Sequence, residues 1–283
     1  MHLYDAHNHL QAERFAGRQA ELLAECPEVQ RMVVNGCCEA DWSSVAALAE
    51  AHPQVLPSFG YHPWFIHERT PNWEKELNQL LDAHSAAVGE IGLDRWKEGL
   101  EYAGQEEVFV TQLRIATERN LPASIHCLKA WGRMLELLQK GPVPARGFLL
   151  HSYGGSTEMV PAFAKLGAYF SFPGYFLRQT KSRHRETFRT VPADRLLIET
   201  DAPDQPLPNS LNANQLNDPN GEPLNHPANI RVVYRELAKF LEEPEEQLVK
   251  REEEQGEGPT LVCSATLGTL TGSGNAPPRK RSL

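Results

Sequence analysis

The sequence predicts an α/β protein, with a (β/α)8 barrel of the TIM type as the favoured architecture. Eight short apolar or β-rich runs recur along the chain, and amphipathic helical segments separate most of them. A doubly wound open sheet would give a similar pattern, so the pattern alone leaves both arrangements open. The eight runs cover residues 3–10, 31–37, 55–60, 86–92, 123–127, 147–151, 168–172 and 195–200.

The segments between these runs carry the caps and apolar spacing of helices. Asp41, for example, precedes Val45, Leu48 and Ala49, which share one face of a helix. Residues 202–229 depart from this rhythm, because they are rich in Pro, Asn and Asp and follow the last run. We therefore expect them to form a long functional loop over one end of the sheet.

Length and composition indicate the domain organisation. The chain has 283 residues, of which 41% are hydrophobic and 23% are charged, a balance typical of a globular protein. We expect a single barrel domain over residues 1–249. From residue 250 the sequence becomes charged, then rich in Gly, Ser and Thr, and finally basic. Residues 250–283 are therefore predicted to be a disordered tail.

Charge and cysteine content exclude several classes of protein. The net charge of -9 argues against a broad duplex-binding surface, so a nucleic-acid substrate would have to be held locally. The five cysteines lack CxxC spacing, which fits neither a disulfide framework nor a cysteine zinc site. The sequence contains no run of about 18 apolar residues and no signal-peptide pattern. We expect a cytoplasmic monomer that does not associate with membranes.

Side chains that can bind metal ions follow the apolar runs at five places. In a parallel barrel the carboxyl ends of all strands open on one face, so residues far apart in sequence converge there. His7 and His9 are two residues apart, and both rings therefore lie on the same face of their strand. The six candidates are His7, His9, Glu90, His126, His151 and Asp201.

Each candidate has a simpler interpretation when it is taken alone. A single histidine such as His151 is more often a hydrogen-bonded packing residue, and Glu90 or Asp201 could cap the following helix. Six such residues at the ends of five runs favour a metal centre instead. Imidazole and carboxylate together suit divalent ions, and the lack of cysteine ligands disfavours a closed structural zinc site. The pattern therefore predicts a metal-dependent hydrolase.

The same segments resemble the TatD family of metal-dependent deoxyribonucleases, within the amidohydrolase-like TIM-barrel superfamily. The matching motifs span residues 3–203 and read LYDAHNHL, FGYHP, VGEIGLD, SIH, LLHSYGG and LLIETDAP. The resemblance implies a (β/α)8 barrel that hydrolyses DNA phosphodiester bonds in single strands or from a 3′ end. It also implies two divalent metal ions as cofactors, with Mg, Mn and Zn as the candidates.

The resemblance also assigns roles to the candidate residues. It implies that His7, His9 and Asp201 hold one metal. It implies that His126 and His151 hold the second metal and that Glu90 bridges the two. Paired cations lie about 3.5–4 Å apart in such sites and stabilise charge on the attacking and leaving oxygens. Asp201 would orient the attacking water and accept its proton, so Asp201 and Glu90 are the predicted catalytic residues.

Substrate contacts are predicted at three further positions. His62, in the FGYHP motif, would lie on the same face as the metal residues, where it could bind substrate or hold the turn before Pro63. Arg178 follows the seventh run and could contact phosphate oxygens, although a solvated helix face is the simpler interpretation of the basic cluster around it. Lys129 could contact a phosphate as a point charge.

The chain departs from the family pattern at two places near these residues. The family usually has an arginine two residues after the histidine of the fifth strand, where this chain has Leu128. After GLD the family usually has an aromatic residue directly, whereas this chain has Arg95 and then Trp96. Two alternatives therefore stay open beside the nuclease. One is a hydrolase of a small phosphoester, ester or amide, and the other is a non-catalytic metal-binding barrel.

Overall fold

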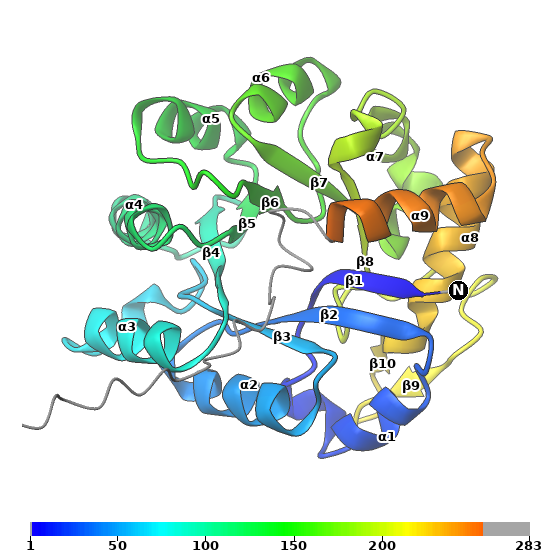
Figure 1. Cartoon of the computed structure of the whole chain (residues 1–283), viewed down its shortest axis with the longest axis horizontal. Helices are drawn as coiled ribbons and strands as arrows, with labels where there is room; N and C mark the ends of the chain where they lie inside the picture. The colour runs from blue at the N-terminus through cyan, green and yellow to red at the C-terminus, as the bar shows by residue number, and fades with distance from the viewer. Residues whose placement is uncertain (1, 257–283) are drawn as a thin grey trace, which may run out of the picture.

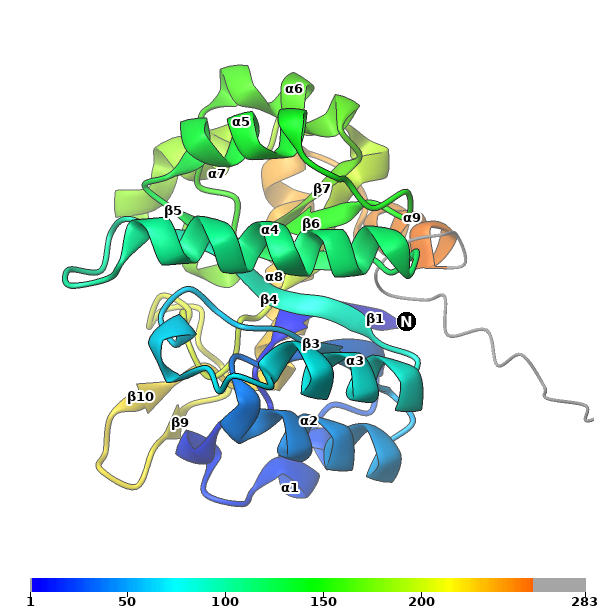
Figure 2. The same ribbon diagram turned by 90° about the vertical axis from the view of Figure 1, so that its left-hand side faces the viewer.

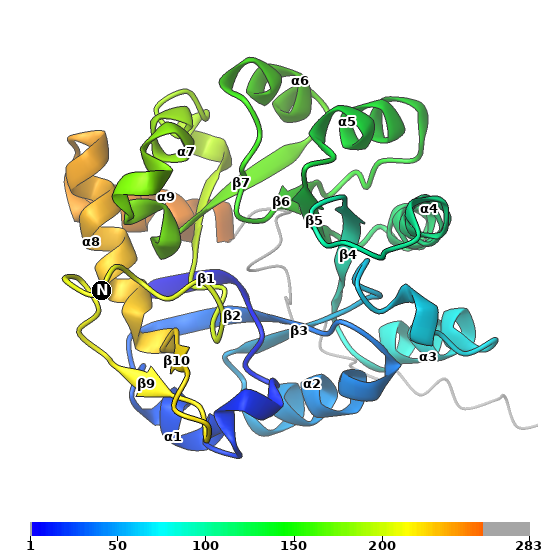
Figure 3. The ribbon, with the colours of Figure 1, turned by 180° about the vertical axis from the view of Figure 1, so that it is seen from behind.

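A computed structural model describes residues 2–256 and contains a barrel of eight parallel strands in chain order (Figures 1 and 3). Each strand from β1 to β8 pairs in parallel with the next one along the chain. This arrangement confirms the barrel and excludes the doubly wound open sheet. The strands are β1 (Leu3–Asn8), β2 (Val29–Asn35), β3 (Val55–Phe59), β4 (Ala87–Asp94), β5 (Ala123–Leu128), β6 (Phe148–Leu150), β7 (Ala168–Pro173) and β8 (Leu196–Glu199).

Helices surround the barrel and connect most of its strands (Figure 1). Their apolar faces pack inward, as in α8, where Ile230, Val233 and Leu237 are fully buried. The α-helices are α1 (Gln19–Ala24), α2 (Glu39–Ala51), α3 (Trp73–Ala83), α4 (Tyr102–Glu118), α5 (Trp131–Lys140), α6 (Val160–Lys165), α7 (Ser182–Thr187), α8 (Ile230–Leu241) and α9 (Glu245–Gly256). The 3-10 helices are η1 (Glu13–Phe15), η2 (Ile66–Glu68), η3 (Thr157–Met159), η4 (Gly174–Leu177), η5 (Gln179–Lys181), η6 (Ala193–Arg195) and η7 (Pro227–Asn229). None of the helices in residues 2–256 combines the length and apolar character needed to cross a membrane.

The predicted long loop, residues 202–229, lies at the carboxyl end of the strands (Figures 2 and 3). It is not wholly irregular, because it contains a short antiparallel hairpin of β9 (Leu216–Asn217) and β10 (Pro223–Leu224). Asn225 anchors the loop, since its side-chain amide donates to the carbonyl oxygen of Thr200 at 2.7 Å. The loop is therefore fixed to the end of β8.

Strands β4 and β5 approach each other closely at one glycine. Gly92 has a φ of +151°, and a Cβ built there would lie 1.9 Å from the carbonyl oxygen of His126. Only glycine fits this contact, because any side chain would collide with the neighbouring backbone. The close approach sets Glu90 of β4 next to His126 of β5.

The seam between β8 and β1 uses side chains as well as backbone. At the carboxyl end of this seam, the Asp201 amide donates to the His7 carbonyl oxygen at 3.0 Å. Toward the amino end two carboxylates accept instead. Asp5 accepts from the amide of Thr200 at 2.9 Å, and Glu252 accepts from the amide of Ile198 at 2.7 Å. The two acids supply acceptors where a continuous β8–β1 ladder would have supplied carbonyl oxygens.

Helix α9 changes the predicted boundary of the tail. Residues 250–256, which we assigned to a disordered segment, continue the helix that begins at Glu245. The reason is visible at Glu252, which is 3% exposed and is held by its hydrogen bond to β8. A charged sequence can therefore pack when one of its acids has a buried backbone donor. The rest of the predicted tail, residues 257–283, lies outside the described residues.

Candidate metal centre

The six candidate residues converge at the carboxyl end of the barrel, although they are up to about 190 positions apart in sequence. His7 is the next-to-last residue of β1 and His9 follows that strand, while Glu90 lies in β4 and His126 in β5. His151 follows β6 directly, and Asp201 is the second residue after β8. Five of these side chains are buried, and that of His9 is 13% exposed.

Glu90 lies at the centre of the cluster. Its Oε1 atom lies 3.0 Å from His126 Nδ1 and 2.9 Å from His151 Nε2. Its Oε2 atom lies 3.1 Å from His9 Nε2 and 3.5 Å from His7 Nε2. Burial alone would raise the pKa of Glu90, but the surrounding imidazoles hold that pKa well below its usual value. The Oε1 atom therefore faces His126 and His151, whereas the Oε2 atom faces His7 and His9.

The rings of His7 and His9 are oriented by hydrogen bonds on their outer nitrogens. His9 Nδ1 donates to the carbonyl oxygen of Asn35 at 2.8 Å, so the lone pair of His9 Nε2 points into the cluster. His7 Nδ1 contacts the hydroxyl of Ser124 at 2.8 Å. The two Nε2 atoms lie 3.2 Å apart, and Asp201 Oδ1 is 3.7 and 3.6 Å from them. Imidazoles fixed from behind in this way, beside a carboxylate, form a donor set that fits a divalent cation.

An acid lies behind each of the other two candidate histidines, but only the acid behind His126 is within hydrogen-bond distance. His126 Nε2 lies 3.0 Å from Asp94 Oδ2, which leaves its Nδ1 atom facing Glu90. Burial would raise the pKa of Asp94, but its hydrogen bond with His126 and the amide of Lys97 lower it overall. His151 Nδ1 lies 3.7 Å from Glu199 Oε1, which is too long for a hydrogen bond.

Burial acts differently on two other members of the cluster. It lowers the pKa of His7 to about 4, which keeps the imidazole neutral and able to donate a lone pair. It raises the pKa of Asp201 to about 7 in the metal-free cluster, where Gln205 Nε2 donates to its Oδ2 atom at 2.5 Å. Both shifts would change when a cation enters, because a cation favours ionised carboxylates and neutral imidazoles.

Sequence patterns did not single out Asp94 or Glu199, although both support the cluster. Glu199 is fully buried and accepts hydrogen bonds from the hydroxyls of Ser152, at 2.5 Å, and Ser171. The signal was present, because Glu199 precedes Asp201 by two residues and the same spacing placed His7 and His9 on one strand face. Asp94 likewise lies four residues after Glu90 in the fully buried β4.

Cys37 also lies beside the cluster, although the sequence pattern gave no cysteine among the candidate ligands. Its Sγ atom lies 3.6 Å from His9 Nδ1. Together with His9 and Glu90 it forms one of the groups whose potential ligand atoms all lie within 4.8 Å of one another. The sequence pattern therefore places no cysteine near the candidate metal residues, whereas the folded chain places Cys37 beside them.

The three predicted substrate contacts occupy different environments. His62 joins the buried cluster, with its Nε2 atom 3.4 Å from Glu90 Oε1. Lys129 is exposed at the end of β5. Arg178 donates through Nη2 to the carbonyl oxygens of Pro206, at 2.9 Å, and Leu207, at 3.3 Å. These bonds hold the loop after β8, so phosphate binding by Arg178 stays a prediction.

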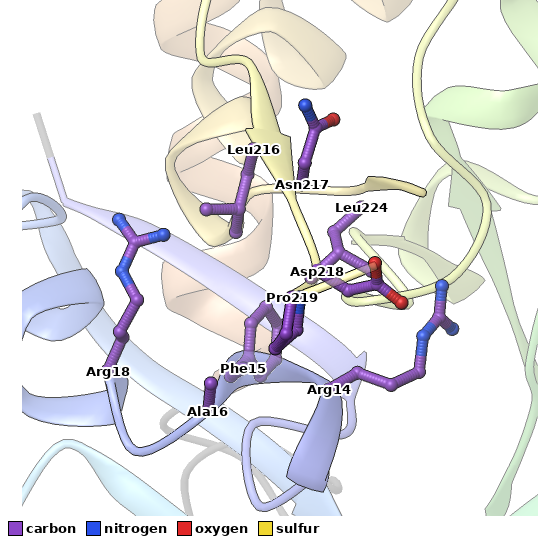
Figure 4. Close-up of a pocket in the computed structure, with 9 residues that line it drawn as sticks. All are labelled: Arg14, Phe15, Ala16, Arg18, Leu216, Asn217, Asp218, Pro219 and Leu224. Atoms are coloured by element: carbon purple, nitrogen blue, oxygen red, sulfur yellow. The ribbon is translucent and has the colours of Figure 1, made fainter. Parts of the chain in front are cut away.

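A pocket of about 200 Å³ lies between η1 and the β9–β10 hairpin (Figure 4). Phe15, Leu216 and Leu224 form apolar parts of its wall, and Arg14 and Arg18 lie on either side. Both arginines are engaged, Arg14 with Asp204 at 2.6 Å and Arg18 with Glu21 at 2.7 Å. The pocket contains none of the candidate metal residues.

Comparisons with known proteins agree with this geometry. The model of the family described as TatD related DNase matches residues 4–254. An uncharacterized metal-dependent hydrolase of Haemophilus influenzae is 30% identical, over 88% of this chain and 96% of its own length. A protein of Escherichia fergusonii named 3′-5′ ssDNA/RNA exonuclease TatD is 29% identical, over 71% of this chain and 79% of its own.

A solved structure gives the same result for the fold. The crystal structure of YjjV, a TatD homolog from Escherichia coli, superposes with a TM-score of 0.80 at 25% identity. The match covers 90% of this chain and 96% of the other. With its barrel, its buried histidine and carboxylate cluster and its family match, the chain belongs to the TatD family and is a metal-dependent hydrolase acting on ester bonds.

Proposed function

We propose that this protein is a deoxyribonuclease that cleaves phosphodiester bonds in single strands or at 3′ ends, with two divalent cations as cofactors. The observation that carries the proposal is the position of Glu90, whose Oε2 atom faces His7 and His9 and whose Oε1 atom faces His126 and His151, at 2.9–3.5 Å. A carboxylate placed in this way can bridge two ions. Mg, Mn and Zn are the candidates.

We assign the ligands to two groups. His7, His9 and Asp201 would hold the first ion, and these three residues have ligand atoms close enough to share one cation. His126 and His151 would hold the second ion, and their inward nitrogens lie 3.3 Å apart. When bound, the cations would act as Lewis acids, lower the pKa of a water molecule and stabilise charge on the phosphoryl oxygens.

The protein's own groups would position the reactants. The Asp201 carboxylate would orient the attacking water through one oxygen and accept its proton. Gln205 donates to Asp201 Oδ2 at 2.5 Å, so the direction of that carboxylate is already fixed. His62, whose pKa burial lowers to about 4, would stay neutral beside Glu90 and could donate a hydrogen bond to the substrate.

Two kinds of relative bear on the substrate. The relative from Escherichia fergusonii is named an exonuclease of ssDNA and RNA, which supports a nucleic-acid substrate. The relative from Haemophilus influenzae, which matches more of the chain, is an uncharacterized hydrolase. Leu128 at the position where the family usually has arginine favours a second candidate, a hydrolase of a small phosphoester. Cytoplasmic location and the monomeric state stay predictions.

One experiment separates these candidates. The protein is dialysed to the metal-free form, Mg, Mn or Zn is added in turn, and three substrates are compared: an end-labelled single-stranded DNA, a small phosphodiester and a carboxylic ester. We expect metal-restored shortening of the DNA from its 3′ end. Rapid turnover of a small substrate with intact DNA would overturn the proposal in favour of the second candidate.

A pair of variants tests the role of Asp201. Asp201→Asn keeps the shape of the side chain but removes its basicity, so we expect turnover to fall by at least about 10²-fold, the lower end of the effect of general base catalysis. Asp204→Asn is the matched control, because Asp204 lies nearby but is exposed, and within residues 2–256 it forms an ion pair only with Arg14. An Asp201→Asn protein with full metal-dependent activity would refute the role.

A further inference from the structure

The large hydrophobic side chains that are exposed within residues 2–256 are confined to one place. They are Trp96, Tyr102 and Leu128, with exposed fractions of 55%, 43% and 37%. Trp96 and Tyr102 belong to the connection between β4 and α4, and Leu128 ends β5. Strands β4 and β5 are neighbours, and Leu128 is the register partner of Asp94. These three side chains, which we call the aromatic rim, therefore lie on adjoining segments.

The aromatic rim is connected directly to the metal centre. Asp94 accepts a hydrogen bond from the amide of Trp96 at 2.7 Å through Oδ1, and its Oδ2 atom lies 3.0 Å from His126 Nε2. The amide of Arg95 donates to the Leu128 carbonyl oxygen at 2.9 Å, which joins the two segments. A single carboxylate thus separates the backbone of Trp96 from a candidate metal ligand. Figure 2 shows this connection projecting at the same end of the barrel as β9 and β10.

Positive charges accompany these side chains in a chain of net charge -9. The Lys97 ammonium lies 4.3 Å from the centre of the Trp64 ring, and the Arg95 guanidinium lies 5.4 Å from that of Tyr102. Lys129 is exposed directly after Leu128. Arg95 also pairs with Glu106 at 3.2 Å, so Lys97 and Lys129 are the cations better placed to meet an anion. Glu98 and Glu101 in the same connection limit the positive region to these positions.

A single nucleic-acid strand matches this combination of an exposed planar ring and flanking cations. Its bases stack on aromatic rings with little sequence preference, and its phosphates are drawn to lysine. An apolar peptide would leave the lysines without partners, and a small phosphoester would not reach the exposed face of Trp96. The two positions where the chain departs from the family pattern, Trp96 and Leu128, both belong to this surface. Within the aromatic rim, Leu128 thus stands at the position where the family usually has arginine.

We propose that Trp96, supported by Leu128 and Tyr102, is the stacking platform for the base of the nucleotide next to the scissile phosphodiester. Lys97 and Lys129 contact the flanking phosphates. The inference rests on the proposed nuclease function and adds the part of the substrate that is recognised. The metal centre holds the reacting phosphate, and the aromatic rim holds its neighbour.

A cycle of two proteins and two ligands tests the stacking. The ligands are a single-stranded oligonucleotide with hydrolysis-resistant phosphorothioate linkages and 2-aminopurine near its 3′ end, and the same strand with an abasic residue at that position. We expect Trp96→Ala to raise the Kd of the base-containing strand by about 5- to 150-fold, the range for loss of one stacked ring. The abasic strand should bind both proteins equally, and 2-aminopurine should be quenched only by the wild type.

Three further variants sharpen the test. Trp96→Phe should keep most of the affinity, since phenylalanine also offers a ring to stack on. Lys97→Ala should weaken both strands alike and reduce the dependence of Kd on salt, whereas Lys140→Ala, on the exposed end of α5, should change neither. Trp96 is largely exposed, so equal melting temperatures are expected for these proteins.

The outcomes separate the two proposals. If the metal-loaded wild type shortens oligonucleotides but Trp96→Ala discriminates base from abasic strand as well as the wild type does, the platform is wrong and the nuclease stands. If the wild type quenches 2-aminopurine through Trp96 but cleaves no strand, the platform stands and the nuclease fails. A wild type that neither binds nor cleaves single strands overturns both.

Discussion

The two ends of the barrel each bury a glutamate, and the two acids are treated in opposite ways. Glu90, at the carboxyl end, is surrounded by imidazoles, which hold its pKa well below the usual value. Glu252, in α9 at the amino end of the barrel, has one backbone donor at 2.7 Å, and its Oε2 atom has no hydrogen-bond partner within residues 2–256. Burial therefore raises the pKa of Glu252 well above the usual value.

The difference distinguishes a site from a structural contact. A buried charge is costly unless opposite charges or hydrogen-bond donors surround it. At Glu90 the chain supplies this environment as imidazoles from the ends of four strands, β1, β3, β5 and β6. At Glu252 it supplies one amide, which is enough to close the seam of the barrel. Strongly shifted pKa values thus occur at both ends, but only at the carboxyl end do several ligand-type groups converge.

Removal of metal should give the largest effect, and only at the carboxyl end. Without cations, the inward nitrogens of His7, His9, His126 and His151 crowd around the single Glu90 carboxylate at 2.9–3.5 Å. We expect complete loss of turnover on dialysis with a chelator. We also expect the melting temperature to fall by about 5–10 °C, since a ligand at 100 times its Kd contributes about 2.7 kcal/mol and each 1 kcal/mol corresponds to about 2–4 °C.

The check is differential scanning fluorimetry with and without Mn²⁺, with Ca²⁺ as a comparison ion. A melting temperature that does not respond to any cation would place Glu90 in the same category as Glu252, as an acid buried for structure alone.

Substitution of Glu90 itself should give the second largest effect. Glu90→Gln keeps the shape and the hydrogen-bonding oxygen but removes the charge that binds both cations. Loss of a residue that only hydrogen-bonds to a metal ligand lowers metal affinity or activity by about 10–100-fold. Loss of Glu90, which is itself the central ligand, should therefore lower turnover by more than about 10²-fold. The metal-dependent rise in melting temperature should also shrink. Glu74→Gln, which removes an exposed acid at the start of α3, is the control.

The sequence predicted the carboxyl end of the molecule well, for a physical reason. Strand alternation and the common direction of the strands are local rules, so His7, His9, Glu90, His126, His151 and Asp201 could be placed on one face from their positions alone. The same rule would have found Glu199 if it had been applied to every second residue of β8. Resemblance to the family then narrowed the predicted hydrolase to a deoxyribonuclease.

The amino end and the supporting contacts could not be predicted in this way. The hydrogen bond between Glu252 and Ile198 joins residues 54 positions apart, and nothing in a run of glutamates marks one as buried. The contact of Cys37 with His9 likewise depends on how the loop after β2 turns inward. Such contacts are decided by tertiary packing, which neither periodicity nor capping patterns record.

A weaker effect is expected one layer behind the metal ligands. Glu199 faces His151 Nδ1 at 3.7 Å and is itself held by two serine hydroxyls, so it is placed to fix the ring when His151 binds a cation. We expect Glu199→Gln to weaken metal binding by about 10–100-fold, with a smaller loss of turnover when metal is saturating. Metal affinity would be measured by competition with a chromophoric chelator.

Glu158→Gln is the matched control, because Glu158 is exposed on the same side of the barrel in η3. Equal metal affinity in Glu199→Gln and the wild type would mean that Glu199 interacts only with the two serines and does not support His151. Glu199 would then be, like Glu252, an acid buried for structure alone.

The smallest effect is predicted at the amino end, and it depends on pH. Because the folded-state pKa of Glu252 is raised, the native state binds a proton that the unfolded chain releases at lower pH. The wild type therefore loses stability as the pH rises from the unfolded pKa, near 4.5, toward the folded value. Glu252→Gln cannot ionise at this position, so it should not lose this stability. The melting temperature of Glu252→Gln minus that of the wild type should therefore increase by a few degrees between pH 5 and pH 8, at about 2–4 °C per kcal/mol.

This prediction concerns the slope and not the absolute stability. The amide oxygen of glutamine can still accept from the Ile198 amide, but its NH2 group adds a buried donor whose cost does not change with pH. Glu246→Gln, exposed on the same helix, should follow the wild type at every pH. Turnover at saturating metal should be the same in all three proteins, because Glu252 lies at the opposite end of the barrel from Glu90. Parallel melting curves for Glu252→Gln and the wild type would mean that Glu252 is ionised when folded, and the contrast between the two buried acids would disappear.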